Sequence, residues 1–445
     1  MRIQSFGTKG LFGIFDHHVE LKNDERLTLI HGPNGFGKTT LLRLLREFFA
    51  GRFSEFGKTP LTSFYINFDD KRTITVTKID APDAGAREYK CLIRMDTPNA
   101  KTQEEVVSAQ DYNQFVADEM AKRAPYMQNL GQDLWEDARD GELLDTEELA
   151  ERFGIRHLLK KKSEQRPEWL TDIIGSISVR LIETQRLVLQ RKPRPHFTPR
   201  HQPRSTETVM EYSQQLAGKI QSQFNDYARV SAQLDRTFVV RLLKLDFGLH
   251  ETMPGNTVSE KVENLNEKRR RLMESGLLSR DEEAIPSPEA PNSAIDQILN
   301  AYLQDVESKL AVFDTLLERI EVLKRIVDAH LEYKKMVISQ QFGFQFRTTY
   351  GKHSRILPTS LSSGEQHILI LFYDLLFNDA KSSLILIDEP EISLHVDWQL
   401  SFLSDLQKII SIVPHDIVLA THSPQIVNNH WELTVPLNRP EGAEA

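Results

Sequence analysis

The sequence predicts an α/β protein with an antiparallel β layer and a long helical insertion. Three observations indicate that fold class. Short apolar runs alternate with turn residues near the N-terminus, an apolar seam recurs over residues 299–320, and buried-strand runs return near the C-terminus. A chain of 445 residues is too long for one ordinary core and suits two or three domains.

The composition is that of an ordinary soluble protein. Hydrophobic residues make up 40% and charged residues 27%, which excludes collagen and wholesale disorder, and the single Cys91 excludes a disulfide scaffold. The net charge of -9 argues against a protein covered uniformly by nucleic acid, but it is compatible with a local basic patch. No apolar run is long enough to span a bilayer, and residues 1–5 lack the apolar core of a signal peptide. We therefore expect a cytoplasmic protein without a membrane partner.

The N-terminal elements follow a clear order. An apolar strand at 27–30 precedes a helix at 38–49. Strand-like runs at 63–66, 72–76 and 89–95 are separated by short polar turns, a pattern typical of an antiparallel β layer.

The middle of the chain is more polar. Residues 102–174 have a helical, polar pattern, and one further strand-like run at 177–184 ends at Gln185. Residues 188–207, rich in Pro, Arg and His, predict a linker, because proline at this density fits neither helix nor central strand. A helix is expected over residues 207–236.

Residues 292–335 predict one long helix of about 60 Å. Its apolar residues alternate spacings of four and three, which is the seam of a coiled coil. The seam consists of Leu299, Leu303, Val306, Leu310, Phe313, Leu317 and Ile320. We favour an intramolecular hairpin with the 207–236 helix, and an intermolecular coiled coil is the alternative.

The strongest local feature is the segment 32–40, which fits the P-loop pattern G-x-x-x-x-G-K-S/T between a strand and a helix. Glycines let the backbone amides surround phosphate oxygens at the helix N-terminus. Lys38 is expected to reach the β- and γ-phosphates and the Thr39 hydroxyl to bind Mg²⁺. The candidate nucleotide-binding residues are Asn34, Gly35, Phe36, Gly37, Lys38, Thr39 and Thr40.

Two acids end a buried strand at 384–387. Asp388 is placed to hold a Mg²⁺ shell and Glu389 to polarise an attacking water. Pro390 then stops the strand. A solvated acidic turn is the alternative for this segment taken alone.

Two further segments bear on the site. Ser362, Ser363 and Gly364 precede an apolar helical run, and small residues there make an anion site, with a routine helix cap as the alternative. His422 follows the buried strand 416–420, at the edge where α/β sheets bind ligands. It is a candidate hydrogen-bond donor to the γ-phosphate, and a structural histidine is the alternative.

Taken in chain order, four motifs (the P-loop, the segment at 362–364, the acids at 388–389 and His422) resemble those of the ABC-type ATPase superfamily. The resemblance covers about residues 1–98 and 340–428. The resemblance implies an ABC-type P-loop ATPase head with a helical, coiled-coil insertion between its two half-lobes. About 320 residues separate Lys38 from Ser362, a spacing similar to that of the SMC-like branch, which includes the RecF and OLD families. The expected domains are 1–98 (P-loop lobe), 99–187 (helical subdomain with a return strand), 188–338 (linker and helical arm) and 339–445 (C-terminal half of the head).

Residues 361–367, 388–395 and 421–426 resemble the corresponding motifs of OLD-like ATPases of bacterial anti-phage systems such as PARIS, Septu and retron-associated systems. This implies an ATPase that acts as sensor and scaffold, with DNA or a phage protein as candidate trigger. Because about two dozen residues follow His422, we expect the nuclease or toxin effector to be a separate protein. A RecF-like DNA-binding repair ATPase is the main alternative, and an assembly platform with negligible turnover is another.

The resemblance also implies roles for individual residues. Glu389 would be the general base, His422 the γ-phosphate switch, and Gln185 the glutamine that senses metal and water. The implied Mg²⁺ ligands are Thr39, Asp388 and Gln185. Ser362, Ser363 and Gly364 would contact ATP held by another subunit, so that a homodimer or higher homo-oligomer forms through ATP-sandwiched heads.

Overall fold

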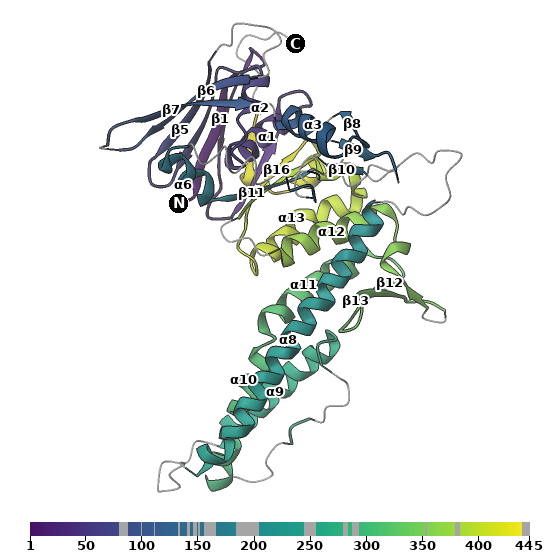
Figure 1. The fold of residues 1–445 in the computed structure, drawn as a ribbon. Helices are drawn as coiled ribbons and strands as arrows, with labels where there is room; N and C mark the ends of the chain where they lie inside the picture. The colour runs from purple at the N-terminus through teal and green to yellow at the C-terminus, as the bar shows by residue number, and fades with distance from the viewer. Residues whose placement is uncertain are drawn as a thin grey trace. The chain divides into compact units, whose positions relative to one another are not determined.

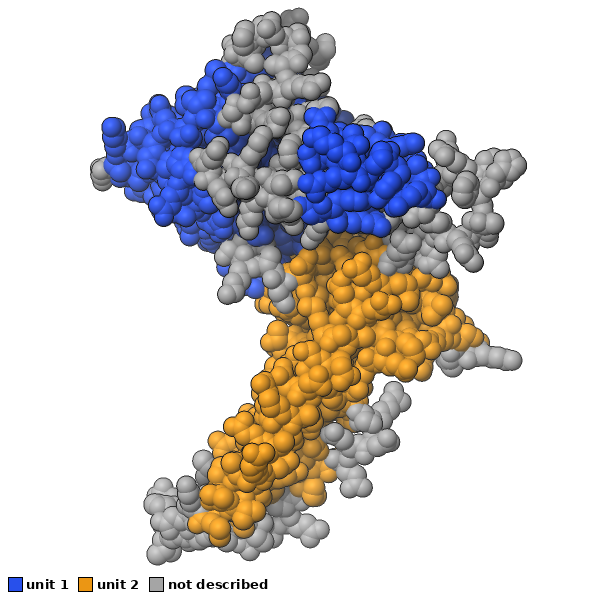
Figure 2. All heavy atoms as spheres, viewed as in Figure 1, with its two compact units in different colours: residues 1–184, 380–392, 414–445 blue, residues 185–379, 393–413 orange. Residues whose placement is uncertain are grey.

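In a computed structural model, the chain forms two compact units, which we describe separately (Figures 1 and 2). Unit 1 comprises residues 1–184, 380–392 and 414–445, and unit 2 comprises residues 185–379 and 393–413. The structure describes residues 1–79, 88–98, 100–110, 112–131, 134–139, 143–145, 149, 152–154, 166–183, 204–243, 255–278, 284–286, 293–351, 354–378 and 383–437. Gln185 and most of the predicted linker at 188–207 lie outside the described residues.

Unit 1 contains the predicted antiparallel β layer. Its strands pair in the order β2-β1-β4-β5-β6-β7, and every pair is antiparallel. In β2 buried and exposed residues alternate strictly, as expected of a strand with one face toward a core. The strands are β1 (Ile3–Leu11), β2 (Phe15–Glu20), β4 (Ser63–Phe68), β5 (Thr73–Ile79), β6 (Glu88–Asp96) and β7 (Gln103–Gln110).

A second sheet of unit 1 is entirely parallel, in the order β11-β15-β16-β3-β17. Asp388 at the end of β15 pairs with Ala420, and Thr421 at the end of β16 pairs with His31 of β3. The register therefore brings the carboxyl ends of three neighbouring strands to one edge. The strands are β3 (Leu27–His31), β11 (Ser178–Glu183), β15 (Ser383–Asp388), β16 (Asp416–Thr421) and β17 (Thr434–Pro436).

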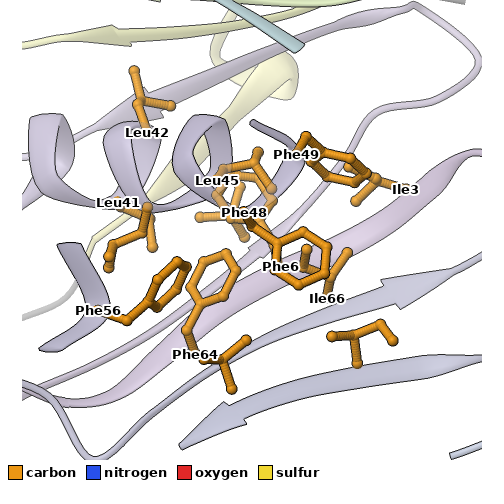
Figure 3. Packing of buried hydrophobic residues seen from close by; sticks show 14 of the residues in the cluster. Ile3, Phe6, Leu41, Leu42, Leu45, Phe48, Phe49, Phe56, Phe64 and Ile66 are labelled. Carbon is orange, nitrogen blue, oxygen red and sulfur yellow. The ribbon is translucent and has the colours of Figure 1, made fainter. Parts of the chain in front are cut away.

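Helix α1 (Lys38–Phe49) has the bounds that the sequence predicts and belongs to one hydrophobic core with residues of both sheets. Phe48 of α1, Phe6 of β1 and Phe64 of β4 point toward one another in Figure 3 and are fully buried. Leu386 of β15 and Val418 of β16 belong to the same cluster. Packing of α1 fixes where the helix begins, and so fixes the loop that precedes it. The short helix α2 (Ser54–Lys58) extends this core.

The predicted helical pattern over residues 102–174 is wrong for much of that range. Gln103–Gln110 is strand β7, which pairs with β6 at the edge of the antiparallel layer. Pairing with the preceding strand decides this segment, because a polar strand needs a neighbour to satisfy its backbone. The other elements are α3 (Tyr112–Arg123), α6 (Glu168–Ser176) and a small sheet of β8 (Met127–Gly131), β9 (Leu134–Asp137) and β10 (Leu143–Asp145).

Unit 2 contains the predicted helical arm, built from α8 (Arg204–Leu242), α9 (Gly255–Glu274), α10 (Ser293–Ala311) and α11 (Asp314–His330). Helix α10 contacts α8 and α9, so the apolar seam packs within the chain, as favoured from the sequence.

The single helix predicted over 292–335 is wrong in length. It is interrupted between α10 and α11, where the ring of Phe313 is fully buried 5.3 Å from that of Phe224 and 5.4 Å from that of Tyr227. It then ends at His330, and Lys334–Ser339 is strand β12. Apolar periodicity continues through the interruption because each of the two helices buries an apolar face, although their main packing neighbours differ.

The remaining elements complete the two units. Unit 2 also holds β13 (Gly343–Thr348), β14 (Arg355–Ile356), η1 (Pro358–Ser360), α12 (Ser363–Phe377) and α13 (Val396–Ile410). The turn η2 (Pro390–Ser393) follows β15, while α14 (Pro424–Val427) and η3 (Trp431–Leu433) follow β16. Within the described part of the chain, no helix combines the length and apolar character that crossing a membrane requires.

Candidate active site

The P-loop connects β3 to α1 through two glycines in the left-handed region, Gly35 with φ of 83° and Gly37 with φ of 82°. A Cβ on Gly37 would lie 2.6 Å from Cδ2 of Leu11, so a larger residue is excluded there by space as well as by backbone conformation. No described side chain caps the N-terminus of α1, and its first turn holds no acidic residue. The first amides of α1 are therefore available to an anion.

Lys38 is buried beneath this loop. Its Nζ donates to the carbonyl oxygens of Gly32 at 2.8 Å and Pro33 at 3.0 Å. Burial lowers the pKa of Lys38, and the carboxylates of Glu389, Glu391 and Asp388 raise it in part. The ammonium thus lies in the field of three acids that follow one another closely in the sequence.

Glu389 has an unusual backbone conformation at the end of β15. Its φ is 46°, and its amide donates to the carbonyl of Ala420 in the neighbouring strand at 2.9 Å. A left-handed conformation is costly for a side chain of this size and persists only where surrounding structure imposes it. The chain turns sharply here, so Asp388 stays 8% exposed while the Glu389 side chain is 19% exposed.

His422 directly follows β16 and faces two glutamates. Its Nδ1 lies 3.0 Å from Oε1 of Glu391 and 3.9 Å from Oε1 of Glu389. The imidazole side chain is 41% exposed, whereas the Glu391 side chain is 6% exposed. One side of the ring is therefore fixed by protein and another is open to a ligand.

Three residues that were not predicted as site residues, Glu391, His17 and His31, also lie beside the P-loop and the acids. His17 of β2 is buried, and its Nε2 lies 2.7 Å from the carbonyl of Phe36, the centre of the P-loop. A carbonyl oxygen only accepts, so Nε2 carries the proton. Burial lowers the pKa of His17, which favours this neutral form.

His31 at the end of β3 lies beside the same groups. Burial and the nearby Lys38 ammonium lower its pKa. Local patterning gives no sign of either histidine's role, because both roles depend on how the chain folds around the P-loop. Only the acid at Glu391 offered a local signal, three residues after Asp388.

The signature-like segment lies in unit 2, at the start of α12. Ser362 is an exposed N-cap whose Oγ accepts from the amide of Glu365, while the Glu365 side chain accepts from the amide of Ser362 at 2.8 Å. The Lys334 ammonium donates to both oxygens of Glu365, at 2.7 and 2.8 Å. Burial would raise the pKa of Glu365, but Lys334 and Ser362 outweigh it and hold that pKa below its usual range. Ser362 is therefore a helix cap, and its hydroxyl proton remains to be donated.

The predicted site residues thus fall into three groups. Lys38, Asp388, Glu389 and His422 lie together in unit 1 with the P-loop. Ser362, Ser363 and Gly364 lie in unit 2, and Gln185 lies outside the described residues.

The residues of unit 1 fit a magnesium–nucleotide group. Thr39 provides a hydroxyl in the first turn of α1, and Asp388 provides a carboxylate at the strand end. Mg²⁺ commonly takes one or two protein oxygens and fills its shell with phosphate oxygens and water. This set matches that preference, and loop amides together with Lys38 match the phosphates.

Comparison with known proteins adds to this geometry. The sequence matches the family described as AAA ATPase domain over residues 1–427. A search of curated proteins found no match.

Three solved structures of SMC heads are similar. One, derived from Pyrococcus furiosus, has an extended coiled coil and is bound to the C-terminal domain of ScpA. It is 13% identical in sequence, and the match covers 96% of this chain and 91% of that chain with a TM-score of 0.35. A head bound to the C-winged helix domain of ScpA has 8% identity, coverage of 96% and 92%, and a TM-score of 0.34. The head from Thermotoga maritima has 10% identity, coverage of 98% and 92%, and a TM-score of 0.33. At these TM-scores the likeness carries no assignment.

A parallel sheet, a P-loop between a strand and a helix, and acids at the adjacent strand end define a P-loop nucleotide-binding protein. The family match spans nearly the whole chain, so the chain belongs to the AAA ATPase domain family. It is an ATPase of that family.

The buried His17 makes a prediction about pH. Its pKa is lowered from the ordinary 6.5, so the unfolded chain binds more protons than the folded chain as the pH falls below about 6.5. Stability is therefore lost on acidification, until the lowered pKa of the folded state is passed. In His17→Gln, whose amide can still donate to Phe36, we expect the slope of unfolding free energy between pH 7 and 5 to decrease by at most about 1.4 kcal/mol per pH unit. Urea unfolding of both proteins across this range measures the slopes, and equal slopes would contradict a buried neutral His17.

Proposed function

We propose that the chain hydrolyses ATP with Mg²⁺ at the unit 1 site, and that a second copy of the chain completes the site with its signature segment. One observation carries the proposal. Glu389, strained at a strand end and partly exposed, lies 3.9 Å from Nδ1 of His422 and near enough to Lys38 to raise its pKa. A base, a cation and a hydrogen-bonding ring thus meet beside the P-loop.

Binding of the nucleotide uses the loop and the helix. The amides of residues 35–40 would surround the phosphates, with the N-terminus of α1 adding its partial positive charge. Lys38 would transfer its Nζ hydrogen bonds from the carbonyls of Gly32 and Pro33 to phosphate oxygens. Thr39 and Asp388 would hold Mg²⁺, which when bound neutralises charge on the phosphates.

Hydrolysis uses the two side chains at the strand ends. Glu389 would accept a proton from the water that attacks the γ-phosphorus, as the bond to the β–γ bridging oxygen breaks. His422 would donate a hydrogen bond to a γ-phosphate oxygen and Lys38 would stabilise its charge. The partly exposed Glu389 carboxylate can meet water, which a base in this position requires.

The chemistry of Ser362 supports the proposal that a second chain completes the site. Ser362 is exposed and keeps its hydroxyl proton at the N-terminus of α12, where the helix dipole favours an anion beside the amides that Glu365 does not use. We propose that this segment meets the γ-phosphate bound by another copy, which would give a homodimer or a higher homo-oligomer with ATP between heads.

We further propose that turnover controls a separate nuclease or toxin effector in anti-phage defence. This rests on the resemblance of residues 361–367, 388–395 and 421–426 to ATPases of such systems. The site chemistry is compatible with that role because hydrolysis would separate the paired chains and so release a partner.

Glu389→Gln tests the base. We expect kcat for ATP hydrolysis to fall roughly 10²- to 10⁴-fold, because the amide cannot accept the proton. ATP binding should be retained, since Lys38 and the loop are intact, and trapped ATP should stabilise the dimer. Phosphate release, nucleotide titration and mass measurement give these three quantities. Unchanged turnover would reject Glu389 as the base.

Completion in trans is tested by mixing two inactive variants. Lys38→Ala should weaken nucleotide binding. Gly364→Asp should place a carboxylate opposite the γ-phosphate bound by the other copy. Helix α12 should still form in this variant, because an acidic residue in the first turn stabilises a helix. Each variant alone should be inactive. An equimolar mixture should recover roughly a quarter of the wild-type rate, since half of the pairs are mixed and each holds one intact site. No recovery, together with wild-type turnover that is independent of dilution, would contradict a shared site.

Control of an effector is tested by co-expression with the product of the neighbouring gene. We expect a complex whose mass or stoichiometry differs between the ATP-bound Glu389→Gln protein and the nucleotide-free wild type. Native mass measurement of the purified complexes decides this. If no complex forms in either nucleotide state, control of that neighbouring effector is rejected while ATP hydrolysis stands.

A further inference from the structure

Glu391 lies in the turn η2, two residues beyond the proposed base. Its Oε1 accepts hydrogen bonds of 2.8 Å from Thr421 Oγ1 and from the His422 amide, and lies 3.0 Å from His422 Nδ1. The side chain is only 6% exposed. A buried carboxylate is costly unless donors surround it, so these contacts fix Glu391 to the end of β16.

We propose that Glu391 is a positioning residue for His422, an inference that rests on the proposed ATP hydrolysis at this site. Its carboxylate holds both the backbone amide and Nδ1 of His422. The ring is therefore oriented with Nε2 as the nitrogen available to the terminal phosphate.

The contact between Glu391 and His422 determines which ring nitrogen of His422 carries a proton. An ionised carboxylate has no proton to give, so the proton between Glu391 and His422 belongs to Nδ1. A neutral ring protonated on Nδ1 has an acceptor at Nε2, which a phosphate oxygen cannot use. A ring that carries protons on both nitrogens has two N–H groups to donate. His422 can then donate from Nε2 while Nδ1–H stays on Glu391.

The two glutamates of this turn have different surroundings. Glu389 is three times as exposed as Glu391, at 19% against 6%, and its Oε1 is 3.9 Å from His422 Nδ1 rather than 3.0 Å. Pro390 separates them and ends the strand. Glu389 is thus placed for water, and Glu391 for holding the histidine.

Glu391→Gln tests the assignment, because the amide has the same shape but no charge. We expect kcat for ATP to fall roughly 10-fold or more, with the Kd for ATP changed less than about 2-fold, since a charge-assisted hydrogen bond is replaced by a neutral one. In the His422→Ala background the same substitution should change kcat less than about 2-fold. The matched control is Glu432→Gln, which neutralises a glutamate whose Oε1 lies 3.1 Å from Nδ1 of His430; its kcat should be unchanged.

Two results would overturn the proposal: an unchanged kcat in Glu391→Gln, or an equal fall with and without His422. Thr421→Val is the second variant in case Glu391→Gln does not fold. It removes one donor to Oε1 and keeps the charge. We expect a smaller fall in kcat that again disappears in the His422→Ala background, and an equal fall in both backgrounds would count against the proposal.

A second readout is independent of turnover. In protein labelled with ¹⁵N-histidine, the ring signals of His422, identified by their loss in His422→Ala, should show a protonated Nδ1 in the wild type and a changed pattern in Glu391→Gln. Identical patterns would overturn the proposal. A changed pattern in a protein that does not hydrolyse ATP would reject the proposed function and keep the positioning contact.

Discussion

The candidate site depends on one constraint, the register of the parallel sheet in unit 1. Asp388 is paired with Ala420, and Thr421 with His31, so three strands end at the same level. Parallel strands joined by crossovers place all their carboxyl ends on one edge, and side chains beyond that edge converge. A shift of one strand by one residue would turn its terminal side chains to the other face of the sheet.

The core beneath the P-loop transmits this constraint to the helix. Apolar residues of α1 belong to one cluster with residues of β1, β4, β15 and β16, and Figure 3 shows those of α1 beside those of β1 and β4. The helix cannot slide without creating cavities, so its N-terminus keeps a fixed position relative to Asp388. His17 adds a direct bond to the loop itself, through the carbonyl of Phe36.

Charge and strain are concentrated where the chemistry is proposed. Lys38, with a pKa lowered by burial, lies among acids that partly restore it, and Glu389 has a positive φ. Such a cluster is an expensive arrangement for a stable fold, and it persists because sheet pairing and hydrogen bonds impose it. Glu391 shows how: it joins the turn after β15 to the end of β16 through one buried oxygen.

The sequence alone determined the local features: the P-loop, the acids after an apolar run, the helix at Lys38–Phe49 and the seam of the arm. Each of these follows from spacing within a few residues, where propensity and periodicity act directly. Only the tertiary structure decided that Gln103–Gln110 is a strand, that Phe313 interrupts the long helix, and that Glu391 and His17 touch the site. Those outcomes depend on partners beyond the reach of one helical turn or one strand, and pairing and packing between separate segments leave no periodic trace in either segment by itself.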